Sequence, residues 1–315
     1  MTTLLLADIG ATHARFAVLS GSLLGAVSSL AVAAYPTIEA ALRHFLDLQS
    51  GARFDHAILA VAGPIEAGRC VMTNSRWVVD AAQLQVQFGF NSVRLINDLV
   101  AVAYALPHLA STDVREYGRG KAKAGEPVAV VAPGTGLGMA CLLDGQGERV
   151  LASEGGHATL AASNVRQAAM IAILQRRFGH VSAERVLSGA GIVNLYAAIS
   201  EIEGIEAKPL TPAQITRAAL DGTCALSREA LDAFCAFLGA VAGDAALMFG
   251  ARGGMYVGGG IVPRIIDYIG RTDFRMHFEA KGRLSGYLAT VPIKVIQRPD
   301  PAFLGLAALG GMGHG

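Results

Sequence analysis

The sequence predicts an α/β protein with two domains that share a cleft, and three observations support this fold class. The chain has 315 residues, a length that suits two domains better than one compact unit. Strand-like apolar runs alternate with helical patterns along it. A strand–turn–strand unit near the N-terminus is followed by a second unit of similar layout at residues 128–143, which indicates a duplicated architecture although the two units share little sequence.

The first hundred residues predict a sheet with helices between its strands. Five apolar runs are expected to be strands, at residues 3–7, 15–19, 23–33, 56–61 and 91–96. Because the first three follow one another directly, they indicate a β-meander. Thr37 is expected to cap a helix that runs to Leu48. A second helix follows the last strand until Pro107 ends it.

The remaining two thirds of the chain predict a second domain, mostly helical around a few strands. Its strands are expected at residues 128–132, 139–143, 254–258 and 292–295. Its helices are expected at residues 164–178, 182–200, 211–220 and 227–249, with a terminal one at 301–309. Proline, glycine and charge gather near residues 108–126, so we expect a small domain at 1–110 and a large one at 111–299. The C-terminal helix, at about 300–315, is expected to pack back on the small domain.

Composition and charge exclude several classes of protein. With 52% hydrophobic and 16% charged residues, the chain is not expected to be disordered. A net charge of +1 without a long basic run argues against nucleic acid or an anionic membrane surface as partner. None of the four cysteines forms a C-x-x-C pair, so reduced thiols are favoured over zinc or disulfides.

The N-terminal apolar run gives no sign of a targeting segment. No basic region precedes it and it breaks at Asp8, so we expect no signal peptide. The most apolar long stretch, at residues 231–248, carries Asp232 and Asp244, so we expect no membrane helix. The predicted location is the cytoplasm.

Three glycine-rich turns lie where predicted strands end. Such turns expose backbone N–H groups that can bind phosphate oxygens. The first also has a threonine hydroxyl and a carboxylate able to hold hydrated Mg²⁺, although an ordinary hairpin is the alternative. The second lacks the lysine of a G-x-x-x-x-G-K-[ST] loop and opens no helix, which excludes the dinucleotide fingerprint. The third would let adenine or ribose lie against bare backbone. The residues are Asp8, Gly10, Ala11 and Thr12; Gly134, Thr135 and Gly136; and Gly258, Gly259 and Gly260.

Polar residues suited to a small ligand stand at two further places. Asn97 and Asp98 end a strand and begin a helix, so Asp98 is either a ligand group or an N-cap. Glu154 and His157 flank two glycines, and both side chains can reach one polyol; zinc is the alternative, without a cysteine or histidine at ligand spacing. Glu184 is expected in a first helical turn behind Ser182, where it would favour the helix dipole or bind a ligand.

These motifs together resemble the bacterial glucokinases of the proteobacterial type, in the actin-like/hexokinase ATPase superfamily. The resemblance spans almost the whole chain and rests on the order of LLLADIGATHARFAVL, AVAGPI, MTNSRW, LINDLVAVAYAL, VVAPGTGLGMA, SEGGHATLA, HVSAERVLSGAGIVNLY and YVGGGIVPR. It implies a duplicated actin-like (ribonuclease H-like) fold with two domains around a cleft. It also implies ATP-dependent phosphorylation of D-glucose at the 6-hydroxyl, with Mg²⁺, by a homodimer.

The resemblance also implies roles for individual residues. Asp98 matches the catalytic base, and the sugar ligands are Asn97, Glu154, His157, Glu184 and, more loosely, Asn74. Gly10, Thr12, Gly134, Thr135 and Gly136 match the phosphate turns, and Gly258, Gly259 and Gly260 the adenosine side.

The first phosphate turn departs from the usual D-x-G-G-T-N, with Ala11 for the second glycine and His13 for asparagine. Since alanine disfavours a positive φ, the turn requires a negative φ at Ala11. The cysteine-rich zinc motif of the repressor–kinase branch is not matched, so no structural zinc is expected.

Other functions on the same fold remain open. A broader hexose kinase would differ by a single sugar contact. A sugar-sensing repressor would need a DNA-binding segment, for which the turn at Asp8 leaves no room. An actin-like ATPase that acts on proteins would not need Glu154 and His157 beside Asp98.

Overall fold

The chain folds into two compact units in this computed structural model, which describes residues 3–49, 53–72, 75–144 and 149–312. The first unit comprises residues 1–109 and 298–315, and the second comprises residues 110–297. Each unit has its own hydrophobic core.

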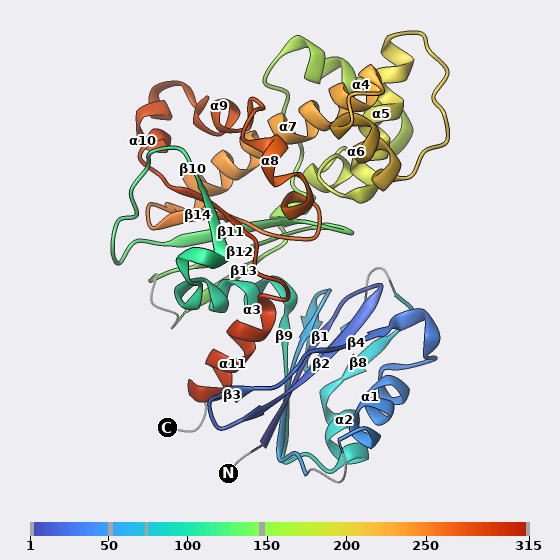
Figure 1. Cartoon of the computed structure of the whole chain (residues 1–315), viewed down its shortest axis with the longest axis vertical. Helices are drawn as coiled ribbons and strands as arrows, with labels where there is room; N and C mark the ends of the chain where they lie inside the picture. Colours follow the sequence, from blue (N-terminus) through green and yellow to red (C-terminus); the bar gives the residue numbers. More distant parts are fainter. Residues whose placement is uncertain (1–2, 50–52, 73–74, 145–148, 313–315) are drawn as a thin grey trace. The chain divides into compact units, whose positions relative to one another are not determined.

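A six-stranded sheet forms the centre of the first unit (Figure 1). β1 (Thr3–Ile9) pairs antiparallel with β2 (His13–Ser20) and parallel with β5 (His56–Val61), and β5 pairs parallel with β9 (Ser92–Asn97). In order across the sheet the strands are β3 (Leu23–Leu24), β2, β1, β5 and β9, with β4 (Ser28–Ala31) also paired to β2. A smaller sheet contains β6 (Ile65–Glu66), β7 (Arg69–Val71) and β8 (Val78–Asp80).

Helices cover both faces of the first sheet (Figure 1). They are α1 (Ile38–Asp47) and α2 (Ala81–Phe88) on one face, and α3 (Asp98–Ala105) and α11 (Ala302–Met312) on the other. Alternate residues of β1 face the first pair, where the Phe16 and Phe45 rings stack at 5.1 Å. α3 and α11 pack so closely that a Cβ on Gly305 would lie 1.9 Å from the Ala101 carbonyl oxygen.

The second unit repeats the strand pattern of the first. β11 (Val128–Pro133) pairs antiparallel with β12 (Leu137–Leu142) and parallel with β14 (Gly254–Val257), and β14 pairs parallel with β15 (Ile293–Ile296). The strands β1, β2, β5 and β9 pair in the same way in the first unit. This recurrence confirms the predicted duplicated architecture. The order is β10 (Val114–Tyr117), β15, β14, β11, β12 and β13 (Val150–Ser153).

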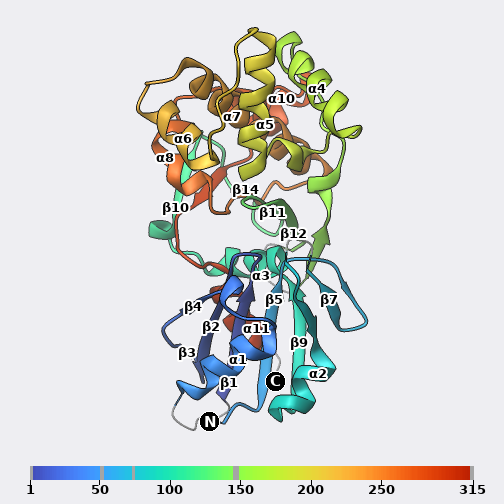
Figure 2. The same ribbon diagram turned by 90° about the vertical axis from the view of Figure 1, so that its right-hand side faces the viewer.

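The helices of the second unit gather around one long central helix (Figure 2). They are α4 (Val165–Phe178), α5 (Gly189–Ile202), α6 (Pro212–Leu220), α7 (Ala225–Phe249), α8 (Ile266–Ile269), α9 (Phe274–Glu279) and α10 (Ser285–Ala289). Among the described residues, α7 is the one helix that is long and apolar enough to span a membrane. However, 72% of its most apolar window is buried inside the protein, as in the central helix of a core.

Two predicted elements are wrong in detail. The strand expected at 23–33 is β3, β4 and a 3₁₀ turn, Val32–Ala34. The helix expected at 182–200 is a 3₁₀ turn, Ala183–Arg185, followed by α5, because the Ser188 hydroxyl accepts a hydrogen bond from Gly191 N and starts the helix there. Glu184 therefore lies in a single 3₁₀ turn, and not in the first turn of an α-helix. The further 3₁₀ turns are Leu106–His108, Ser111–Asp113, Gly155–His157, Val262–Ile265 and Gly282–Leu284.

Candidate active site

The turn between β1 and β2 carries the first set of predicted phosphate-binding residues. A hydrogen bond of 3.0 Å from Gly10 N to the His13 carbonyl oxygen closes it. Among the described non-glycine residues, only Ala67 and Asp300 have a positive φ. Ala11 therefore does not need the conformation that its methyl group disfavours, and the turn forms with alanine in place of the usual glycine.

Asp8, at the end of β1, is half-buried beside a cation. Arg15 Nη1 lies 3.4 Å from Asp8 Oδ2, and Arg15 Nε lies 3.0 Å from Asp300 Oδ1. Burial raises the pKa of Asp8 to about 6; Arg15 opposes this rise and the charge of Asp300 adds to it. The carboxyl group is therefore held where loss of water is costly and one guanidinium partly compensates for it.

Asn97 and Asp98 lie at the same edge of the sheet as this turn. Ile9 is in register with Val61, and Val61 with Asn97, so Asn97 is two strand spacings, about 10 Å, from the end of β1. Carboxyl ends of parallel strands gather ligand groups in this way.

Asn97, and not Asp98, is the N-cap of α3. Asn97 Oδ1 accepts hydrogen bonds from Leu99 N at 2.9 Å and Val100 N at 3.3 Å. Asp98 is the first helical residue, and its Oδ1 accepts from Leu99 N at 2.8 Å. Burial, and then the negative charge of Asp98, raise the pKa of the Cys70 thiol on β7. The charge of Asp98 is thus felt at the small sheet, and Asn97, not Asp98, supplies the N-cap of α3.

The second and third glycine turns lie side by side in the second unit. Gly134 N donates to the Gly136 carbonyl oxygen at 2.8 Å, which closes the turn between β11 and β12. At the end of the neighbouring β14, Gly259 has φ +80°, and a Cβ there would lie 2.2 Å from the Pro133 carbonyl oxygen. Only glycine fits both the conformation and the contact. A Cβ on Gly134 would approach Gly260 N to 3.9 Å, so the two turns are neighbours.

Glu154 precedes, and His157 ends, a 3₁₀ turn that packs on the start of β12. A Cβ on Gly156 would lie 2.0 Å from the Leu137 carbonyl oxygen, so this position accepts only glycine. Both Glu154 and His157 are exposed. The turn is joined to the segment before Glu184 by a hydrogen bond of 3.0 Å from Ala183 N to the Ala158 carbonyl oxygen.

Glu184 contacts the end of the second glycine turn directly. Its Oε2 accepts a hydrogen bond of 2.8 Å from Leu137 N, one residue beyond Gly136. Sequence reasoning missed this contact, because its partner is a backbone group with no signature in the residue types. It also missed Arg15 and Asp300; Arg15 lies within the first motif, but nothing in the sequence around Asp300 indicates its pairing.

The structure thus groups the predicted residues by unit. In the first unit, Asp8, Gly10, Ala11, Thr12, Asn97 and Asp98 share one edge of the sheet. In the second, Gly134, Thr135, Gly136, Gly258, Gly259, Gly260, Glu154, His157 and Glu184 surround the ends of β11, β12 and β14. Asn74 lies outside the described residues.

The described residues offer Mg²⁺ a single carboxylate ligand and no complete protein site. The residues that the structure describes include no cluster of three or more histidine, cysteine, aspartate or glutamate side chains that could hold a metal. Mg²⁺ in nucleotide sites commonly keeps several waters and takes one or two carboxylates plus phosphate oxygens. Asp8, beside the first phosphate turn, suits that kind of site.

Known proteins with a similar sequence or fold include several glucokinases. A glucokinase structure from an Antarctic psychrotroph covers 99% of this chain and is itself 99% covered, with a TM-score of 0.87 and 37% identity. A ROK family glucokinase from Streptomyces griseus, solved with glucose and AMPPNP, has a TM-score of 0.67 over 98% of both chains at 16% identity, which shows the fold alone. The glucokinase of Aromatoleum aromaticum is 44% identical over 96% of this chain and 93% of its own.

The duplicated fold with its glycine turns, together with these relatives, defines a sugar kinase of the actin-like ATPase class. The glucokinase family model matches residues 5–311. The chain belongs to the glucokinase family.

Proposed function

We propose that this chain transfers the γ-phosphoryl group of ATP to the 6-hydroxyl of D-glucose, with Asp98 as the general base. One observation carries the assignment of Asp98: Asn97 caps α3, which leaves a half-buried aspartate at the sheet edge that also bears the first phosphate turn. Membership of the glucokinase family supports the choice of substrate and donor.

In the proposed reaction Asp98 accepts the proton of the 6-hydroxyl as its oxygen attacks the γ-phosphorus. The bond from that phosphorus to the bridging oxygen breaks, and ADP leaves with the electron pair. The N–H groups of the two glycine turns stabilise charge on the phosphate oxygens. Asp8 would hold a hydrated Mg²⁺ through water, and the ion would neutralise part of that charge.

The roles are divided between the two units, which we take to be the functional domains. The first carries Asp98, Asn97 and the turn at Gly10 to Thr12. The second carries the proposed sugar ligands Glu154, His157 and Glu184, the turn at Gly134 to Gly136, and Gly258 to Gly260 on the adenosine side. Asn74 is a looser candidate sugar ligand. Family likeness alone supports a cytoplasmic homodimer, and sedimentation of the purified protein tests the dimer.

A coupled assay of ADP release across a panel of hexoses tests the proposal. We expect release that depends on glucose and is weaker with mannose and glucosamine. Equal turnover of several hexoses would favour a broader hexose kinase. No sugar-dependent ADP release would favour a sugar-sensing protein.

A further inference from the structure

The segment from Glu184 to Gly189 holds the second phosphate turn at both ends. At one end, Glu184 Oε2 accepts the 2.8 Å hydrogen bond from Leu137 N. At the other, Gly189 N donates to the Gly134 carbonyl oxygen at 2.9 Å. We call residues 184–189 the clasp.

The clasp is itself fixed to the body of the unit. The Ser188 hydroxyl donates to the Glu184 carbonyl oxygen at 2.9 Å and accepts from Gly191 N at 3.0 Å, so the same side chain closes the clasp and caps α5. Ser188 is buried. The backbone of Glu184, which carries the carboxylate, is therefore held by the residue that caps α5.

Gly136 leaves room for the carboxylate. A Cβ at this position would lie 2.4 Å from Glu184 Oε2 and 3.2 Å from its Cδ, so any larger residue would displace the carboxylate. The Glu184 carboxylate can therefore reach Leu137 N only because residue 136 is glycine.

We propose that Glu184 is a positioning residue for the phosphate turn, in addition to its role toward the sugar. One carboxylate oxygen anchors Leu137 N beside the turn, while the other stays available to a sugar hydroxyl. Through the clasp, Glu184 supports nucleotide binding even before sugar is present. This inference rests on the proposed function, because it assigns the turn to ATP phosphates.

The test is the affinity for AMPPNP, with Mg²⁺ and without sugar, measured by calorimetry on the full chain. We expect Glu184→Ala to weaken AMPPNP binding about tenfold, the order expected when a hydrogen bond to a charged group is lost. Glu184→Gln should retain most of the affinity, because its amide oxygen can still accept from Leu137 N. The KM for ATP at saturating glucose should move in the same order.

Two further variants separate positioning from sugar contact and from misfolding. Gly136→Ala keeps the carboxylate but displaces it, and should weaken AMPPNP binding as Glu184→Ala does. His157→Ala removes another proposed sugar ligand, and should raise the KM for glucose while leaving sugar-free AMPPNP affinity unchanged. Circular dichroism and the melting temperature check the fold of each variant.

Different results would contradict the positioning role of Glu184 and the proposed phosphorylation of glucose. Folded Glu184→Ala and Gly136→Ala variants with the AMPPNP affinity and ATP KM of the unmodified chain would overturn the positioning role. That result would leave glucose phosphorylation intact. If the unmodified chain bound AMPPNP but released no ADP with glucose, the proposed function would fail instead.

Discussion

Arg15 Nε lies 3.0 Å from Asp300 Oδ1, and this ion pair joins β2 to the segment that leads into α11. Asp300 has φ +48°, in the left-handed region that costs most non-glycine residues about 1–2 kcal/mol and that aspartate tolerates better. Its side chain thus serves both the pairing and the local conformation. The same guanidinium also reaches Asp8, so the C-terminal segment is connected through Arg15 to the end of β1.

Replacing Asp300 by alanine should therefore lower the free energy of unfolding by about 1–2 kcal/mol, since alanine is strained at this φ and the partly exposed pair is worth at most about 1 kcal/mol. Urea denaturation measures the change. Asp300→Gly is the matched control. Glycine also removes the ion pair with Arg15 but adopts the positive φ without strain, so the free energy of unfolding should fall by less than in Asp300→Ala. An Asp300→Ala variant as stable as the unmodified chain would contradict this account.

Asp98→Asn should cut kcat by about 10²- to 10⁴-fold, the usual contribution of a general base. The asparagine oxygen can still accept from Leu99 N, so α3 and the affinity for glucose should survive. Steady-state kinetics measures the first effect and calorimetry with glucose the second. Near-normal turnover in this variant would refute the assignment of the base.

Asp8 should contribute less to the stability of the protein above neutral pH than below pH 4. Its native pKa of about 6 exceeds the ordinary 3.8, so the folded state binds the proton more tightly than the unfolded state. The stability linked to this group is complete below about pH 4 and is lost as pH rises through about 6. The Arg15 and Asp300 charges that face Asp8 are already included in this balance.

Asp8→Asn should remove the loss of stability that accompanies ionisation of Asp8, and it should also lower activity. Without added Mg²⁺, the variant should exceed the unmodified chain by about 2–3 kcal/mol at pH 7.5, and the two should converge near pH 4. Thermal or urea denaturation at both pH values measures this. A difference of equal size at pH 4 would show that burial of the ionised carboxylate is not its cause.

Restoring the usual glycine with Ala11→Gly should not improve the enzyme. Because Ala11 does not have a positive φ, glycine relieves no strain and only adds freedom to the unfolded chain. We expect a loss of about 0.4–1 kcal/mol in unfolding free energy, with kcat and the KM for ATP nearly unchanged. A clear rise in kcat would show instead that the methyl group hinders the phosphates.

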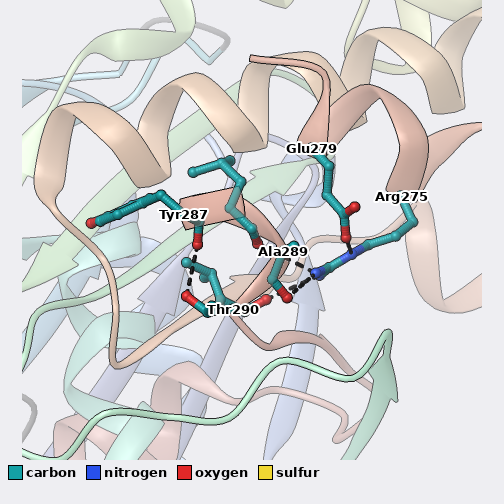
Figure 3. Close-up of polar contacts among 7 residues, drawn as sticks. Arg275, Glu279, Tyr287, Ala289 and Thr290 are labelled. Atoms are coloured by element: carbon teal, nitrogen blue, oxygen red, sulfur yellow. Dashed lines mark hydrogen bonds and ion pairs between the residues drawn. The ribbon is translucent and has the colours of Figure 1, made fainter. Parts of the chain in front are cut away.

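Arg275 ties together the end of α10 and its surroundings (Figure 3). It donates to the carbonyl oxygens of Leu288, Ala289 and Val291, at 3.3, 3.1 and 3.0 Å, and pairs with Glu279. Its guanidinium also lies against Gly118, which has φ +87° and no space for a Cβ.

Arg275→Ala should therefore cost about 2–4 kcal/mol of unfolding free energy, because several carbonyl groups lose their donor at once. Arg275→Lys should lose less unfolding free energy than Arg275→Ala but should still be less stable than the unmodified chain, since an ammonium cannot reproduce the planar fork of donors. The exposed Arg271 provides the control, and its alanine variant should change stability by no more than about 0.5 kcal/mol. Equal losses of unfolding free energy in Arg271→Ala and Arg275→Ala would contradict the stabilising role of the Arg275 hydrogen bonds.

Local chemistry was sufficient to predict much of this protein. Residues 56–61 form the predicted strand, and Thr37 caps the predicted helix, because apolar runs and capping side chains act over a few residues. The order of the motifs alone indicated the family. The glycine turns could be located because glycine is required where backbone approaches backbone, as at Gly259.

Tertiary structure decided what depends on distant partners. By sequence Asp98 was either a ligand group or the cap, and only the hydrogen bonds of α3 show that Asn97 is the cap. Ser188 divides the expected helix at 182–200, which places Glu184 in a 3₁₀ turn where it meets Leu137 N, 47 positions away in the chain. Such pairs involve backbone groups that every residue carries. Their partners are set by strand register and packing, which no local pattern of residue types records.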